Sequence, residues 1–275
     1  MNRGSNWLQV GELTDGFGGH ELQPSTALAG SRHQLTFDDG SQTELSFSAA
    51  GEIACTPRGA DGAAAFLGKG SVECAVTSLR PDVFFVDFLP TAQRRNSVSL
   101  VLDVATGVVS AVLGTLPTRE ETQRSLFSRA VAAEELTPVI ARVHAASLTA
   151  ERPGPGRRHE PTTELVGRRV MYDYGARDMY EHVYLNERFY TWQCLRGPER
   201  GLADTDRCYY HKVGEELYLF VWLEKIVPTL GTVLVDLKGL RTTGKIFGYR
   251  TSDFGEVSNA RVGALAKVLN VTTYG

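Results

Sequence analysis

The chain has 275 residues, with 29 Lys and Arg against 32 Asp and Glu, which gives a formal net charge of −3. This near-neutral balance argues against nucleic acid or an anionic membrane surface as a partner. No apolar run approaches the roughly 18 residues that cross a bilayer. Residues 1–7 carry no signal-peptide pattern, so we expect a cytoplasmic protein.

The four cysteines lie far apart along the chain, at Cys55, Cys74, Cys194 and Cys208. They form no CxxC pair, the spacing that structural zinc sites favour. Without a secretion signal, reduced and buried thiols are the expectation. No two histidines or carboxylates recur at metal-ligand spacing, so the sequence predicts no metal site.

In the first half of the chain, short β-branched and aromatic runs are broken by Gly, Asp and Asn, a pattern of strands and turns. The predicted strands are 32–38, 43–49, 72–78, 83–89, 97–103 and 107–113. A capping-box spacing joins Thr118 to Glu121 and predicts a helix over 118–136. A second short helix is predicted over 139–148.

Residues 150–163 hold three Pro, two Gly and several Arg with almost no apolar side chain, which indicates a solvated linker. The strand pattern then resumes, and a closing helix is predicted over 258–269. The predicted strands of this half are 168–174, 179–186, 188–195, 206–213, 216–225, 232–238 and 242–249. The sequence thus divides into an N-terminal domain over 1–149 and a C-terminal domain over 164–275.

The two halves resemble each other, which indicates an internal duplication. The matching segments are 28–37 with 165–174, 84–90 with 219–225, and 98–104 with 232–238. In nearly the same register Cys55 matches Cys194 and Cys74 matches Cys208. Each unit has about six or more antiparallel strands, enough to close a small barrel.

The period of two along a strand assigns side chains to faces. One face of 216–225 holds Tyr218, Phe220, Trp222 and Glu224, and one face of 168–174 holds Val170, Tyr172 and Tyr174. If this aromatic face is the inner one, desolvation raises the pKa of Glu224 and suits it to proton transfer. The alternative places Glu224 at a strand end, in water. The first half has Leu35, Phe37 and Leu89 at the positions of Tyr172, Tyr174 and Glu224.

Further polar residues follow the same alternation. Tyr180, His182 and Tyr184 share one face of their strand, where His182 is either a ligand or base, or a structural hydrogen-bond partner. Trp192 and Gln193 point to opposite faces, so at most one of them lines a barrel interior.

A family resemblance rests on residues 165–186, on Tyr190-Thr-Trp-Gln-Cys-Leu-Arg-Gly197 and on Trp222-Leu-Glu-Lys225. Together with Gly16-Phe-Gly-Gly-His-Glu-Leu-Gln-Pro-Ser25, these segments resemble the molybdenum cofactor biosynthesis protein F (MoaF) family over nearly the whole chain. The resemblance implies a mainly β protein with a few short helices and two tandem lipocalin-like (calycin) antiparallel β-barrels.

The second half also resembles, more distantly, the phenolic acid decarboxylases, which are lipocalin-like barrels that work without a cofactor. Their Tyr-x-Tyr pair, which holds the substrate carboxylate, corresponds to Tyr172 and Tyr174. Their catalytic Glu, two residues after a strand Trp, corresponds to Glu224. Their active-site Arg follows a glycine-rich turn, for which Gly197-Pro-Glu-Arg-Gly201 offers Arg200, with Arg196 and Arg207 nearby.

We therefore expect a cofactor-independent lyase or isomerase that acts on a small conjugated or aromatic acid in the C-terminal barrel. The catalytic residues would be Glu224, Tyr172 and Tyr174, and the substrate-binding residues Arg200, His182, Tyr184, Trp222 and Gln193. The alternatives are a non-catalytic small-molecule-binding or pathway accessory protein, and a scaffold whose barrels are filled by side chains. The apolar first copy is compatible with packing, with a homodimer or with binding an apolar ligand.

Overall fold

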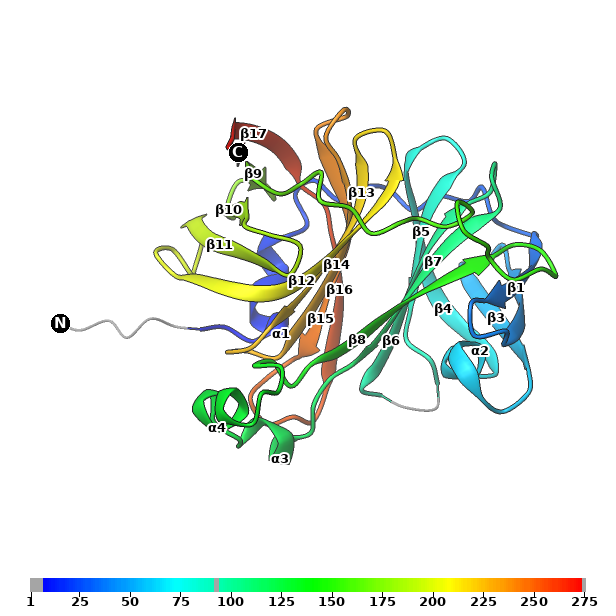
Figure 1. Cartoon of the computed structure of the whole chain (residues 1–275), viewed down its shortest axis with the longest axis horizontal. Coiled ribbons are helices and arrows are strands. Elements are labelled where there is room, and N and C mark those ends of the chain that lie inside the picture. Colours follow the sequence, from blue (N-terminus) through cyan, green and yellow to red (C-terminus); the bar gives the residue numbers. More distant parts are fainter. Residues whose placement is uncertain (1–6, 92–93, 274–275) are drawn as a thin grey trace. The chain divides into compact units, whose positions relative to one another are not determined.

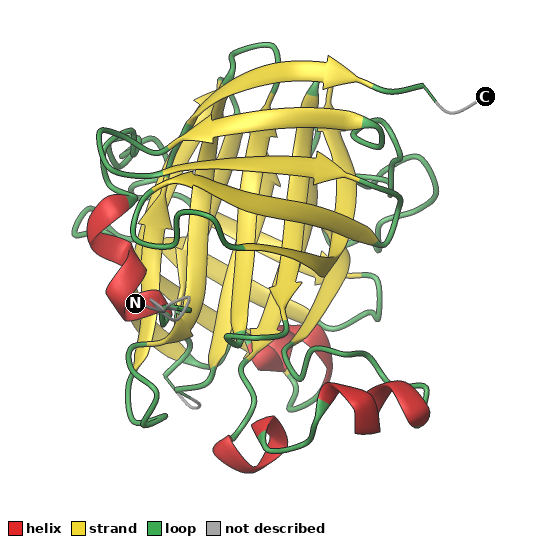
Figure 2. Ribbon diagram, turned by 90° about the vertical axis from the view of Figure 1, so that its left-hand side faces the viewer, coloured by secondary structure: helices red, strands yellow, loops and turns green. Residues whose placement is uncertain are grey.

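The computed structural model describes residues 7–91 and 94–273, and it is mainly β with a few short helices (Figures 1 and 2). The chain forms two antiparallel barrels, each inside its own compact unit. The unit of the N-terminal barrel comprises residues 22–115 and 141–160. The unit of the C-terminal barrel comprises residues up to 21, 116–140 and 161 onward.

The N-terminal barrel closes through eight strands in chain order. These are β1 (Arg32–Phe37), β2 (Gln42–Phe47), β3 (Glu52–Arg58), β4 (Gly70–Arg80), β5 (Val83–Phe88), β6 (Asn96–Asp103), β7 (Val108–Thr115) and β8 (Ile140–Ser147), with helix α2 (Gly62–Phe66) between β3 and β4. Its core is apolar, with Leu35 and Phe37 fully buried among Val, Leu and Phe side chains.

The C-terminal barrel repeats this antiparallel order. Its strands are β9 (Arg168–Asp173), β10 (Met179–Tyr184), β11 (Phe189–Arg196), β12 (Ala203–Gly214), β13 (Leu217–Glu224), β14 (Thr229–Asp236), β15 (Arg241–Tyr249), β16 (Val257–Val262) and β17 (Leu265–Val271). The last two behave as one strand interrupted at residues 263–264. Its first part pairs with β15, and its second part crosses to β9 and closes the barrel.

Two segments from the first half of the sequence belong to the C-terminal unit. Helix α1 (Val10–Leu13) and the 3-10 turn η1 (Thr14–Gly16) pack against this barrel, where α1 contacts β15 and β16 (Figure 1). The segment with α3 (Arg119–Thr122) and α4 (Leu126–Val131) is anchored by Tyr249, whose hydroxyl donates to Pro117 O at 2.6 Å. The compact units are therefore not contiguous in sequence.

The predicted helix over 118–136 is two short helices instead. The capping box is present, since Glu121 N donates to Thr118 Oγ1 at 3.2 Å and Thr118 N donates to Glu121 at 2.6 Å. However, Ser125 caps a new helix by accepting from Ser128 N at 3.1 Å. A serine side chain that competes for backbone groups in this way interrupts a helix.

The helices predicted over 139–148 and 258–269 are wrong, because both segments are strands. Ile140–Ser147 is β8, which pairs with β1 at Thr36 and Phe37. The second segment is β16 and β17. Both segments close a barrel. As strands they pair the backbone groups that an open sheet edge would leave unpaired, and this gain outweighs a weak helix propensity.

The duplication is consistent with the strand order. Cys55 lies on the third strand of its barrel and Cys194 on the third of the other, while Cys74 and Cys208 lie on the fourth strands. All four are free thiols, and burial raises the pKa of Cys55 and of Cys208 to about 12. Within the described residues, no helix combines the length and apolar character needed to cross a membrane.

Candidate functional site

Aromatic side chains line the inside of the C-terminal barrel. As the period of two predicts, β13 buries Tyr218, Phe220 and Trp222 on one face, in a cluster that includes Tyr172 and Tyr174 from β9 and the turn after it. The Trp222 ring lies flat over Gly231 on β14, where a Cβ atom would meet the ring at 2.0 Å. A glycine is therefore required opposite this tryptophan.

Glu224 ends the β13 face and lines a cavity in the barrel. Its Oε1 accepts a hydrogen bond from Trp222 Nε1 at 2.9 Å. Part of its surface stays accessible, as expected for a cavity wall, but protein atoms replace most of its hydration. Burial raises the pKa of Glu224 well above its usual range, and repulsion from Asp206 raises it further. This carboxyl holds its proton to a higher pH than an ordinary glutamate does.

Asp206 is a second buried carboxylate near Glu224. It is 1% exposed and accepts hydrogen bonds from Trp192 Nε1 at 3.0 Å and from Lys225 Nζ at 3.2 Å. Burial raises the pKa of Asp206, although attraction to Lys225 opposes the shift. Lys225 therefore compensates charge on the outer side of Asp206, while Glu224 has no such cation in its hydrogen bonds.

His182 is part of the aromatic wall. Its ring lies 4.8 Å from that of Tyr172 and 5.1 Å from that of Tyr190, measured between centroids. Desolvation lowers the pKa of His182 to about 3, so the ring is neutral at physiological pH. Its Nδ1 is buried and has no hydrogen-bond partner among the described residues. This environment indicates that His182 is a structural part of the cavity wall rather than a metal ligand or a protonated acid.

The cavity that Glu224 lines is small, about 40 Å³, or room for roughly one water molecule. Leu13 and Phe17 from the N-terminal segment form one side of it. The ring of Phe17 packs edge-on against Tyr174 at 4.4 Å and lies stacked with Tyr180 at 5.6 Å, between centroids. The N-terminal segment therefore covers one side of the cavity in the C-terminal barrel.

Glu199 is a cavity residue that the sequence analysis missed. It lies in the turn after Gly197, is 6% exposed, and accepts from Tyr180 OH at 2.9 Å and from Leu8 N at 3.2 Å. Burial raises the pKa of Glu199. The turn has no strand alternation that could have selected this residue. The glycines at 16–19 were an available signal that the N-terminal segment packs closely on this barrel, because a Cβ at Gly19 would meet Tyr174 O at 2.7 Å.

The predicted site residues do not all converge. Tyr174, His182, Trp222 and Glu224 line the cavity, but Tyr172 lies deeper and shares a hydrogen bond of 2.6 Å with the hydroxyl of Tyr184. Arg200 and Gln193 lie outside this cavity. Arg200 is exposed on the turn, and Gln193 lies on the outer face of β11, where it donates to Glu181 at 2.8 Å.

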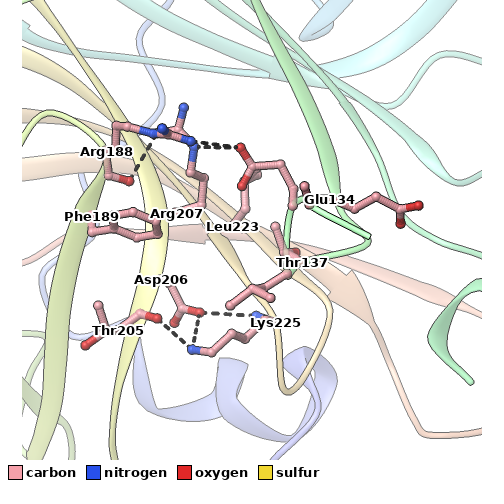
Figure 3. Close-up of a pocket in the computed structure, with 12 residues that line it drawn as sticks. Glu134, Thr137, Arg188, Phe189, Thr205, Asp206, Arg207, Leu223 and Lys225 are labelled. Carbon is pink, nitrogen blue, oxygen red and sulfur yellow. Dashed lines mark hydrogen bonds and ion pairs between the residues drawn. The ribbon is translucent and has the colours of Figure 1, made fainter. Parts of the chain in front are cut away.

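Arg196 also lies outside the inner cavity, where its Nη2 donates to Gly175 O at 2.8 Å in the turn after β9. Arg207 borders a separate cavity of about 240 Å³ outside the barrel interior (Figure 3). The described residues that line the inner cavity include no lysine or arginine. Across the described chain, no group of three or more His, Cys, Asp or Glu is placed to hold a metal ion.

Comparisons with known proteins agree with the two-barrel division. Residues 5–118 match the MoaF N-terminal domain and residues 159–272 match the MoaF C-terminal domain. The curated Protein MoaF of Klebsiella aerogenes is 41% identical over 98% of this chain and 97% of its own length. A solved structure described as "a putative beta-lactamase from Burkholderia vietnamiensis" is 12% identical and covers 38% of this chain and 96% of its own, with a TM-score of 0.32. The chain therefore belongs to the MoaF family.

Proposed function

We propose that the C-terminal barrel is a cofactor-independent lyase or isomerase for a small conjugated or aromatic acid, with Glu224 as the general acid and base. The observation that supports this proposal is the position of Glu224 on an aromatic cavity wall, with its pKa raised by burial. A carboxyl that is protonated near neutral pH can give a proton to a substrate carbon and take one back.

In the decarboxylation of a para-hydroxycinnamic acid, neutral Glu224 adds its proton to the alkene carbon that carries the carboxylate, while the para-hydroxyl gives its proton to water. The quinone methide that results releases carbon dioxide. The electron pair of the broken bond forms the vinyl double bond, the displaced quinone-methide electrons restore the aromatic ring, and water returns a proton to the phenolate oxygen and to Glu224. In an isomerisation, Glu224 instead takes a proton from one carbon and returns it to another. Both reactions use the same group and need neither metal nor cofactor.

The substrate carboxylate would be held by phenolic hydroxyls. Tyr174 lines the cavity, and Tyr172 becomes available when the substrate replaces Tyr184 as its partner. The neighbouring carboxyls Glu199 and Glu224 disfavour an anion unless they are protonated, which their raised pKa values promote. Because the cavity holds roughly one water molecule, substrate entry also requires Phe17 to move away from Tyr174.

A second candidate is a non-catalytic small-molecule-binding protein. Within this family, such a protein would be an accessory protein of molybdenum cofactor synthesis. The small volume of the cavity and the Tyr172–Tyr184 hydrogen bond favour it, because both describe an interior that is largely filled and satisfied by its own side chains. In that case the barrel would bind its ligand without turning it over.

A substrate panel separates the two candidates. Hydroxycinnamic acids come first, followed by conjugated enoic acids and hydroxy acids, with consumption followed by ultraviolet absorbance. Glu224→Gln is compared with Glu215→Gln, a control on a residue whose side chain is 83% exposed in the same unit. Loss of turnover in Glu224→Gln alone supports the enzyme. Binding by thermal shift without turnover supports the binding protein.

A further inference from the structure

The cavity of about 240 Å³ outside the barrel interior plays no part in the proposed reaction (Figure 3). One wall is the irregular segment after α4, residues 133–137, and the other is formed by β11, β12 and the end of β13. It has room for roughly eight water molecules. Its described lining residues are all different from those of the inner cavity.

Arg207 is held in a fixed orientation at this cavity. Its Nη1 donates to Arg188 O at 3.1 Å and to Cys208 O at 2.8 Å. Its guanidinium lies over the Tyr209 ring at 4.6 Å from the centroid, and its side chain is only 15% exposed. The backbone and the aromatic ring therefore fix the group, and its Nε edge faces the cavity wall that carries Glu135.

Glu135 is the only described carboxylate that the two arginines share, and its contacts are long. Arg207 Nε donates to Oε1 at 3.3 Å, and Arg188 Nη2 lies 3.6 Å from the same oxygen. The Glu135 side chain is about half exposed and comes from a segment without regular structure. Two cations therefore face one loosely held anion, which leaves a net positive charge beside the cavity.

Other charges around the cavity have partners elsewhere. Glu134 points away from the two arginines (Figure 3) and pairs with Arg124 at 2.7 Å. Lys225 faces Asp204 and Asp206. The lining carboxylates Glu134, Glu135 and Asp206 equal the lining cations in number, so the positive charge is local to the arginine pair, where Glu135 is the one described carboxylate in contact.

We propose that this cavity binds a small aromatic anion, with its carboxylate or phosphate on Arg188 and Arg207 in place of Glu135. A second anionic oxygen would let the ligand engage the guanidinium edge in a bidentate way, which the single Glu135 oxygen does not. The flat body of the ligand would lie against Phe189 and Leu223, the apolar part of the lining. Glu135 acts as an internal competitor that the ligand displaces.

Benzoate and phenyl phosphate are the probes, and titration calorimetry of the full chain is the measurement. Glu135→Gln removes the competitor, so both probes should bind about tenfold more tightly than to the parent, the factor that one charge-assisted contact supplies. Glu215→Gln makes the same change in net charge at an exposed residue outside the lining and should leave the affinity unchanged. Arg188→Gln, at a residue 59% exposed, should weaken binding about tenfold without unfolding the protein.

Two comparators complete the design. Benzyl alcohol, which has the ring without the charge, should not bind, and inorganic phosphate should bind more weakly than phenyl phosphate. Equal affinities in Glu135→Gln and Glu215→Gln would overturn the proposal, as would dissociation constants weaker than about 10 mM for both aromatic probes. Glu135 and Arg188 lie outside the inner cavity, so the response to their substitutions tests this site independently of the reaction proposed for Glu224.

Discussion

Glu224 is unfavourable for folding, because an ionised carboxylate loses hydration in an aromatic cavity. The sequence register that matched Glu224 with Leu89 is one residue off, because Cys74 pairs with Phe88 where Cys208 pairs with Trp222. The equivalent of Glu224 in the N-terminal barrel is therefore Pro90, so this architecture does not require a carboxylate there. A residue that costs stability where an apolar one suffices is best explained by function. The hydrogen bond from Trp222 orients the carboxyl but does not neutralise it.

The Glu224→Gln substitution keeps the shape and removes proton transfer. With an identified substrate, we expect turnover to fall by roughly 10²–10⁴-fold while the affinity changes little. Tyr172→Phe should show the opposite pattern, since it deletes a hydrogen bond to the substrate carboxylate worth about 1.5–3 kcal/mol. Steady-state kinetics of both variants measure this split. If Glu224→Gln turns over the substrate as fast as the parent, the binding-protein candidate replaces the enzyme.

The raised pKa of Glu224 also predicts how stability depends on pH. The folded protein binds this proton more tightly than the unfolded chain, whose glutamates have a pKa of about 4.3. The stability that protonated Glu224 gives the folded state is therefore fully present below about pH 4. It is lost as the pH rises towards the pKa of Glu224 in the folded protein.

Chemical denaturation should show that Glu224→Gln gains stability over the parent as the pH rises above about 4, because only the parent loses the contribution of the folded-state proton. The exposed control Glu215→Gln should change the free energy of unfolding by no more than about 0.5 kcal/mol. A difference between Glu224→Gln and the parent that does not vary with pH would mean that the Glu224 carboxyl is hydrated in solution.

At the scale of single residues, sequence patterns succeeded where a strand repeats and failed where the chain turns. Alternation along β13 correctly joined Glu224 to Trp222, since a strand can turn only every second side chain to one face. The turn at 197–201 has no such period, and the family resemblance that pointed to Arg200 says nothing about which side chain of the turn faces inward. The residue of this turn that lines the cavity is Glu199.

At the scale of elements, the N-terminal segment is the part that changes the site most. It lines the cavity with Leu13 and Phe17, and Trp7 packs edge-on against Trp192 at 5.8 Å between centroids. Glu199 accepts a hydrogen bond from Leu8 N, so a cavity carboxyl also holds this segment. Access to Glu224 is thus linked to a segment about 200 residues away in sequence.

Removing the Phe17 ring should open the cavity. Phe17→Ala is expected to cost about 3 kcal/mol of unfolding free energy, because the ring is buried against Tyr174 and Tyr180. Acrylamide should then quench tryptophan fluorescence more strongly, since Trp192 and Trp222 line the same cavity. The matched control is Phe127→Ala, on a ring that is 77% exposed, with an expected change within about 0.5 kcal/mol. Equal quenching in both variants would show that Phe17 does not seal the barrel.

Secondary structure was predictable where local chemistry decides it. The capping box at Thr118 and the strands of β13 and β14 are local features, and the sequence pattern located them. β8 and β16–β17 exist because barrel closure needs a final strand, and that requirement joins residues more than 90 positions apart. No local window contains this information, so Ala-rich segments were assigned to helices.

At the scale of the whole molecule, each barrel comes from one half of the chain, but the compact units do not. Residues up to 21 and residues 116–140 belong to the C-terminal unit, while 141–160 belong to the N-terminal unit. The chain therefore passes between the units four times, at 21/22, 115/116, 140/141 and 160/161. The expected linker at 150–163 is only the last of these crossings.

Because the chain passes between the units four times, we expect the two fragments of a chain cut at residues 154–156 to remain associated. The cut falls in a largely exposed Gly-Pro-Gly stretch, where a protease site can be inserted with little strain. The first fragment keeps residues 7–21 and 116–140, which pack into the C-terminal unit. Contacts across the cut include Arg119 Nη2 donating to Asp253 O at 2.6 Å and Thr137 Oγ1 donating to Glu224 O at 3.0 Å.

The fragments should therefore co-elute in gel filtration after complete cleavage and separate only in denaturant. Two sequential domains joined by a simple linker would instead elute as two separate peaks. A second cut site at residues 22–24, between residues 7–21 and β1, serves as the comparison. The doubly cut protein should still retain the N-terminal peptide, because Phe17 is buried in the C-terminal barrel. Elution of the two halves as separate, folded species would show that neither segment contributes to the stability of that barrel.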